Sequence, residues 1–94
     1  MIIGIPKEVK NNENRVSIIP FGVEDLSKCG HQIIIQSQAG IGSGFTDDIY
    51  REMNANIVET PEEVYQQADI IIKVKEPQPE EIQIIKKNQI IFTF

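Results

Sequence analysis

Residues 70–77 are Ile70-Ile71-Ile72-Lys73-Val74-Lys75-Glu76-Pro77, an apolar run that ends in cations just before a proline. A short, almost continuous apolar run predicts a strand that is buried within a sheet, here over residues 70–75. The first apolar run of the chain, residues 2–6, likewise continues into a polar segment that carries Arg15. We therefore expect two cations where two strands end, Lys75 at the end of one strand and Arg15 in the loop beyond the other.

Helical and strand patterns alternate along the whole chain, which is typical of a parallel sheet with crossover helices. The segment Thr60-Pro61-Glu62-Glu63 combines an N-cap, a proline at the first helical position and a capping-box glutamate. Gly30 is placed to end an earlier helix. The patterns predict helices over residues 20–29, 47–53, 61–68 and 79–87, and further strands over residues 31–36, 57–59 and 89–94, the last of them buried.

These elements predict an α/β fold with an open, mainly parallel sheet, similar to the three-layer flavodoxin or Rossmann type. Right-handed crossovers would place residues 70–75 beside residues 2–6, with Arg15 and Lys75 at one switch point of the strand order. Ligands of such sheets bind outside the carboxyl ends of the strands, so two cations there favour a small carboxylate. The alternative is that both are ordinary solvated surface side chains.

The composition limits the other possibilities. With 94 residues, of which 40% are hydrophobic, the chain can bury one modest core. A net charge of −5 without a basic cluster argues against nucleic acid as a partner. We find no signal peptide or membrane-spanning stretch, which makes the cytoplasm the default location. The single cysteine, Cys29, is expected to be buried in a helix, and the single histidine, His31, to be structural, so no metal site is predicted.

A glycine-rich segment, Gly40-Ile41-Gly42-Ser43-Gly44-Phe45, superficially matches a phosphate-binding loop. The dinucleotide fingerprint requires a third glycine where this chain has Phe45. We therefore predict no cofactor-binding residue in this segment. Its glycines are expected to allow positive φ angles and close backbone packing beside the crevice.

Several of these motifs together closely resemble the N-terminal part of the bacterial alanine dehydrogenases, and the resemblance covers all 94 residues. The first of them is shared with the α subunit of the proton-translocating transhydrogenases, which typically have asparagine and alanine where this chain has Lys75 and Glu76. The run Lys73-Val74-Lys75-Glu76-Pro77 therefore favours the amino-acid enzyme. The motifs are residues 4–8, residues 11–16, Pro20, Gly30-His31, residues 39–45 and residues 73–77.

The resemblance implies a substrate-binding segment of an NAD-dependent enzyme that interconverts L-alanine and pyruvate plus ammonium. Arg15 matches the arginine that holds the substrate carboxylate, and Lys75 matches the lysine that bonds the substrate oxygen and polarises the reacting carbon. Lys73 has no assigned role. Glu8 and Glu13 are near enough in sequence to orient the basic groups.

The resemblance also implies that the catalytic histidine, two residues beyond Phe94, and the NAD-binding domain lie outside this chain. We expect residues 1–94 alone to hold no catalytic residue and to be inactive as a dehydrogenase. The family typically forms hexamers, and the apolar last strand of this chain could self-associate. Two alternatives stay open, a transhydrogenase-like fragment and a non-catalytic module that pairs through its last strand.

Overall fold

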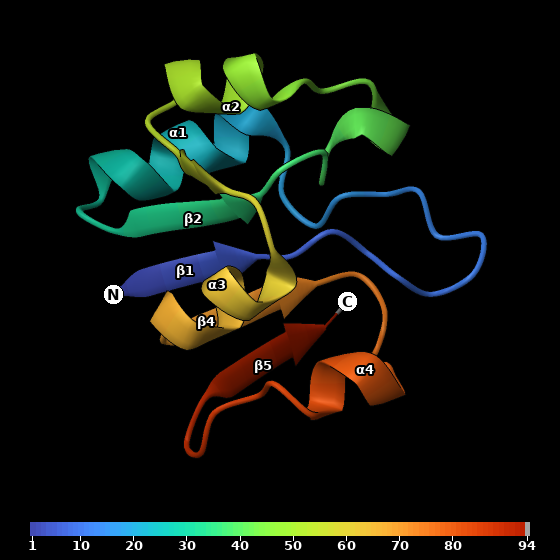
Figure 1. The fold of residues 1–94 in the computed structure, drawn as a ribbon. Helices are drawn as coiled ribbons and strands as arrows, with labels where there is room; N and C mark the ends of the chain where they lie inside the picture. The colour runs from blue at the N-terminus through green and yellow to red at the C-terminus, as the bar shows by residue number, and fades with distance from the viewer. Residues whose placement is uncertain (94) are drawn as a thin grey trace.

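The computed structural model describes residues 1–93, and its strands form one sheet with helices on both faces (Figure 1). Neighbouring strands are all parallel, in the order β3-β2-β1-β4-β5. This is the α/β fold that the sequence predicts. The elements in chain order are β1 (Ile2–Ile5), α1 (Pro20–Lys28), β2 (Gln32–Gln36), the 3-10 turn η1 (Ile41–Ser43), α2 (Asp47–Glu52), β3 (Asn56–Val58), α3 (Pro61–Gln67), β4 (Ile70–Lys73), α4 (Pro79–Ile82) and β5 (Ile90–Thr93).

The central strand, β1, separates the two halves of the sheet. Ile3 of β1 is in register with Ile33 of β2 on one side and with Ile70 of β4 on the other. The chain thus moves outward through β2 and β3 and returns across β1 to β4. The predicted switch point between β1 and β4 is confirmed.

Alternate side chains of the strands enter two separate cores, as the period of two requires. One face of β1 and β2 packs against α1 and α2, and the opposite face of the sheet packs against α3. The first core is centred on Ile3, Ile5, Ile33, Ile35, Val23 and Tyr50, and the second on Ile34, Ile71, Val64, Tyr65 and Ala68.

Local signals set the helix ends as expected. The Thr60 hydroxyl accepts the Glu63 N–H at 3.3 Å at the start of α3, and the Thr46 hydroxyl accepts the Ile49 N–H at 3.3 Å at the start of α2. Gly30, which follows α1, has a φ of 92°, a conformation that glycine adopts without steric cost. Within residues 1–93, no helix is long and apolar enough to cross a membrane.

Two predictions for the C-terminal part are wrong. The helix predicted over residues 79–87 ends at Ile82, because Ile84 and Ile85 turn inward to pack against the second core. The last strand is not buried: Ile90 and Phe92 are 53% and 51% exposed, since β5 is an edge strand that is paired with β4. Residue 94, the predicted end of this strand, lies outside the described residues. The expected self-association through β5 stays a prediction.

A third expectation also fails, since Cys29 is exposed at the end of α1. It directly follows the last helical residue, Lys28, and both of its neighbours, Lys28 and Gly30, are exposed as well. Its position in the last turn did not reveal which side of the helix faces the sheet.

Gly4 lies where α3 approaches the sheet most closely. A Cβ atom at this position would lie 2.7 Å from the Cβ of Ala68 and 2.8 Å from a methyl group of Val64. We expect Gly4→Ala to lower the free energy of unfolding by about 1–3 kcal/mol, the usual cost of overpacking a core. Urea denaturation would measure this loss.

The matched control is Gly22→Ala in α1, where the added Cβ would meet a single atom, the Cγ2 methyl of the half-buried Ile18 at 2.7 Å, instead of atoms of three packed residues. Alanine also favours the helix over glycine by about 1 kcal/mol. An equal loss of stability in both variants would contradict close packing between β1 and α3.

Candidate functional site

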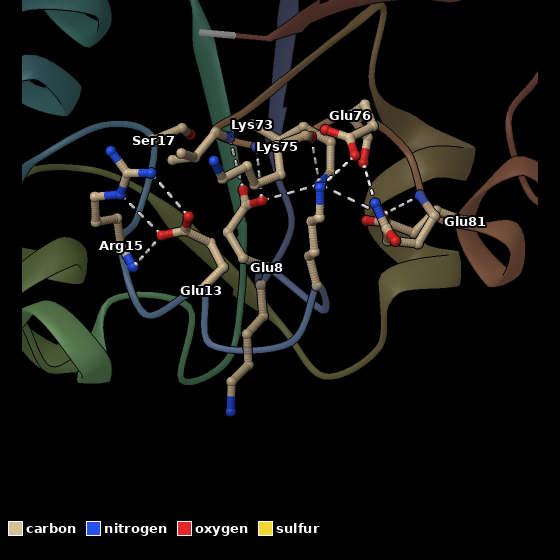
Figure 2. A network of polar contacts seen from close by, with 12 residues as sticks. Glu8, Glu13, Arg15, Ser17, Lys73, Lys75, Glu76 and Glu81 are labelled. Atoms are coloured by element: carbon tan, nitrogen blue, oxygen red, sulfur yellow. Dashed lines mark hydrogen bonds and ion pairs between the residues drawn. The ribbon is translucent and has the colours of Figure 1, made fainter.

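A network of charged side chains lies at the carboxyl ends of β1 and β4 (Figure 2). It joins the segment after β1, residues 6–19, to the segment after β4, residues 74–78. At its centre, the Lys73 ammonium lies 3.0 Å from Oε1 of Glu8 and 3.4 Å from Oε1 of Glu81. The side chains of all three residues are at most 3% exposed, so this is a buried ion-pair cluster.

Glu8 also fixes the backbone that follows β4. Its Oε2 accepts the Val74 N–H at 2.9 Å, and its Oε1 accepts the Lys75 N–H at 3.2 Å. The Lys73 ammonium in turn donates to the Lys75 carbonyl at 3.0 Å. Residues 74 and 75 are therefore held by side chains instead of by the strand ladder. Sequence reasoning placed Lys75 within the strand, but β4 ends at Lys73 and Lys75 lies two residues beyond it.

Glu81 ties two helices to the same cluster. Its carboxylate accepts a hydrogen bond from the buried Tyr65 hydroxyl at 3.0 Å and from the Gln78 N–H at 2.9 Å. Burial raises the pKa of Tyr65 well above its usual range, and the Glu81 charge raises it further. The phenol therefore stays a proton donor throughout the physiological pH range.

Arg15 is paired with Glu13 in a two-bond arrangement. The Nε–H of Arg15 donates to Oε2 of Glu13 at 2.9 Å, and Nη2 donates to Oε1 at 2.8 Å. The hydrogen bond from the Arg15 side chain is the main cause that lowers the pKa of Glu13 to about 2, and it raises the pKa of Arg15. Figure 2 shows Glu13 turned toward the guanidinium.

Lys75 contributes a second cation at this edge. Its charge also lowers the pKa of Glu13, which indicates that the two groups lie within electrostatic reach of one another. Lys75 is half-buried, and its ammonium has no hydrogen-bond or ion-pair partner among residues 1–93. The structure thus brings the two predicted site residues, Arg15 and Lys75, to the same edge of the sheet.

The glycine-rich segment supports the Arg15 segment from the other side. A Cβ atom at Gly42 would lie 2.5 Å from the carbonyl oxygen of Asn14, so only glycine allows this approach. The Ser43 hydroxyl accepts the Val16 N–H and donates to the Asn14 carbonyl, each at 3.3 Å. These contacts agree with the close packing that the sequence predicts for this loop.

Two hollows adjoin Arg15. One, of about 190 Å³, lies between residues 7–15 and residues 38–42 and includes Glu13 in its wall. The other, of about 370 Å³, is lined by Ser17, Phe45 and Val74 as well as Arg15. Lys75 lines neither of them. A small carboxylate in either hollow could reach the guanidinium.

Other candidate groups lie away from this edge or form no site. His31 directly precedes β2, at the amino-terminal edge of the sheet, opposite the edge that follows β1 and β4. Among residues 1–93, no three histidine, cysteine or acidic residues are grouped to hold a metal ion.

The structure pairs both glutamates that the sequence suggested would orient basic groups, Glu8 with Lys73 and Glu13 with Arg15. Sequence reasoning missed the burial of Lys73 and the role of Glu81. The available signal was the lysine itself, because a cation at the end of an isoleucine run is rarely buried without an anion. It also missed the exposed pair between Lys10 and Glu76, which links the same two segments a second time. The Lys10 hydrogen bond is the main cause that lowers the pKa of Glu76 to about 2.

The buried cluster yields a stability prediction. Lys73→Met keeps the length of the side chain but leaves the Glu8 and Glu81 carboxylates buried without their cation. We expect the free energy of unfolding to fall by about 3–5 kcal/mol. Urea denaturation of Lys28→Met, which breaks only an exposed pair with Glu24, should show a change below about 1 kcal/mol. Similar small losses in both variants would contradict a buried ion pair at Lys73.

Comparisons with known proteins agree with the geometry. Over all 94 residues, the chain is 50% identical to an alanine dehydrogenase of Methanococcus maripaludis and 46% identical to one of Bacillus subtilis. It spans about a quarter of the length of these relatives, 25% in each case.

The solved structures that superpose on this chain include an alanine dehydrogenase and a transhydrogenase. An L-alanine dehydrogenase superposes with a TM-score of 0.96 at 41% identity, over 100% of this chain and 26% of that one. A transhydrogenase from Sinorhizobium meliloti superposes with a TM-score of 0.92 at 28% identity, over 99% and 26% of the two chains. The family model described as alanine dehydrogenase/PNT, N-terminal domain, matches residues 4–94. The chain therefore belongs to the family of alanine dehydrogenase and transhydrogenase N-terminal domains.

Proposed function

We propose that residues 1–94 are the N-terminal part of the substrate-binding domain of an NAD-dependent L-alanine dehydrogenase. Such an enzyme converts L-alanine, NAD⁺ and water into pyruvate, ammonium, NADH and a proton. The observation that carries the proposal is the placement of Arg15 and Lys75 at one edge of the sheet, each with donors that no described residue engages. Relatives named alanine dehydrogenase over the whole chain support it.

Each cation suits a different part of the substrate. Arg15 presents a planar fork of donors, which matches a carboxylate through two parallel hydrogen bonds. Lys75 presents a compact charge that can bond the keto oxygen of pyruvate and stabilise the negative charge that develops on it as ammonia adds to the carbon. Loss of that oxygen as water then leaves an imine, whose carbon accepts the hydride. Together they would orient a 2-oxo acid with its reacting carbon between them.

Within residues 1–93, the glycine-rich segment that resembles a phosphate-binding loop does not fit the NAD pyrophosphate. In the glycine-rich segment, the N–H groups of Ser43 and Phe45 both bond the Gly40 carbonyl, at 3.0 and 2.9 Å, and the Gly44 N–H bonds Ile41. These groups are already engaged and cannot cradle a phosphate. We therefore assign the cofactor site to a part of the enzyme outside residues 1–93.

The second candidate is a transhydrogenase-like subunit, which the structural similarity to the Sinorhizobium meliloti protein favours. That protein is 28% identical to this chain, whereas the alanine dehydrogenases named above are 41–50% identical over the whole chain. Lys75 is the residue that separates the two proposals, because the resemblance gives transhydrogenases an asparagine there.

The carboxylate-binding role of Arg15 can be tested on the chain itself. We expect pyruvate to shift the amide NMR signals around residues 13–17 and 73–76. Arg15→Ala removes a charge-assisted pair of hydrogen bonds and should weaken pyruvate binding by about 10- to 100-fold, since such bonds contribute roughly 1.5–3 kcal/mol.

The matched control is Arg51→Ala, which removes another exposed arginine that is paired with a nearby carboxylate, Asp48. It should bind pyruvate as the original chain does. Unchanged pyruvate shifts in Arg15→Ala would reject Arg15 as the carboxylate ligand.

The role of Lys75 requires a complete enzyme. In a chimera, residues 1–94 would replace the corresponding quarter of the Bacillus subtilis alanine dehydrogenase. We expect this chimera to reduce pyruvate with NADH and ammonium, and Lys75→Met to lower its kcat by about 100- to 1,000-fold, the usual effect of removing a donor that stabilises developing charge. Lys87→Met, at an exposed position after α4, is the control. Full activity of Lys75→Met would refute the assigned role.

A further inference from the structure

The pairing of Arg15 with Glu13 restricts how a substrate can approach. A guanidinium carries five N–H donors in a fixed plane. Glu13 occupies the edge formed by Nε and one N–H of Nη2, with donor–acceptor distances of 2.9 and 2.8 Å. The donors that stay accessible are those of Nη1 and the second N–H of Nη2. They form the end of the fork, which can still accept one carboxylate in a two-bond arrangement.

Glu13 is the fixed member of this pair. Its side chain is 6% exposed, whereas that of Arg15 is 66% exposed. The Arg15 backbone N–H bonds the same carboxylate at 2.9 Å, and the Glu13 N–H bonds the Lys10 carbonyl at 3.0 Å. The preceding Asn12 adopts a φ of 66°, which turns the chain sharply at this point. The Glu13 carboxylate thus lies on an ordered turn and holds the largely exposed side chain of Arg15.

We propose that Glu13 is a positioning residue that locks the side edge of Arg15, so that the substrate carboxylate binds end-on at Nη1 and Nη2. This inference rests on the proposed function, because it assumes that Arg15 binds the substrate. The opposite arrangement is a gate, in which the substrate carboxylate displaces Glu13 from the guanidinium.

The positioning role and electrostatics alone predict opposite changes in pyruvate affinity when Glu13 is neutralised. Glu13 carries a negative charge beside Arg15, the proposed carboxylate ligand, and the charge of Lys75 also acts on it. If Glu13 acted only through its charge, neutralising it would reduce repulsion and tighten pyruvate binding. If it positions Arg15, neutralising it frees the guanidinium to rotate, and the ordering of that side chain must then oppose binding.

The decisive variant is Glu13→Gln, which preserves the shape but replaces one acceptor oxygen with an amide that cannot accept the arginine N–H. We expect pyruvate binding, measured by NMR titration of the 94-residue chain, to weaken by about 10-fold. Asp48→Asn neutralises another carboxylate that is paired with an arginine, Arg51, and should leave binding unchanged. Tighter binding in Glu13→Gln would overturn the inference.

The carboxyl signal of Glu13 provides the second readout. The pKa of about 2 means that Glu13 keeps its charge, and the pair persists, as the pH falls through 4.5. With pyruvate bound at pH 5, end-on binding leaves this signal in its ionised, paired position and keeps the Nε–H of Arg15 protected from exchange. Displacement of Glu13 would shift its carboxyl signal and expose that N–H, and would overturn the proposal.

The proposed function and the positioning role of Glu13 fail in distinguishable ways. An intact pair, with low Glu13 pKa and protected Nε–H, in a chain that does not bind pyruvate would reject the proposed function. A Glu13 carboxyl that titrates near 4.5 in the free chain would reject the positioning role, whether or not pyruvate binds.

Discussion

The buried ion pair between Lys73 and Glu8 is the constraint on which the rest of the site depends. It joins the last residue of β4 to the segment that leaves β1, across the switch point of the sheet. A buried pair of this kind contributes little net stability, because desolvation offsets much of the attraction, but loss of one partner is costly. Its effect is therefore mainly geometric. The Glu8 carboxylate of this pair is also the acceptor of the backbone N–H groups of Val74 and Lys75, so it fixes the chain that leaves β4.

The contrast between Lys73 and Lys75 shows how burial separates a structural lysine from the lysine that we propose binds the substrate. Lys73 is fully buried and bonds Glu8 and the Lys75 carbonyl, so it has no donor to offer a ligand without breaking the cluster. Lys75, two residues later, has left the strand ladder, and its ammonium has no partner among residues 1–93. Arg15 lies between these two cases. Glu13 bonds one edge of its guanidinium and leaves the donors of the other edge accessible.

The parts that could be predicted from the sequence are those with local signals. The isoleucine runs predicted β1, β2 and β4, and the alternation of elements with right-handed crossovers predicted that β4 would lie beside β1. Thr60 and Pro61 marked the start of α3 to the residue. The exposed β5 and the short α4 were not predictable in this way, because burial of an edge strand depends on which element covers it. The inward turn of Glu81 likewise depends on Lys73 and Tyr65, which are distant in sequence.

The glycine-rich segment illustrates why a motif must be interpreted through its contacts. Its composition resembles a phosphate-binding loop, yet its N–H groups close a tight turn on the Gly40 carbonyl. Gly42 is required for another reason, since the Asn14 carbonyl lies where a Cβ atom would be. Because Asn14 directly precedes Arg15, this contact sets the position of the guanidinium from the backbone side, while Glu13 sets it from the side-chain side. Arg15 is exposed, but its backbone and its guanidinium are both held, which would lower the cost of ordering it in the carboxylate binding that we propose.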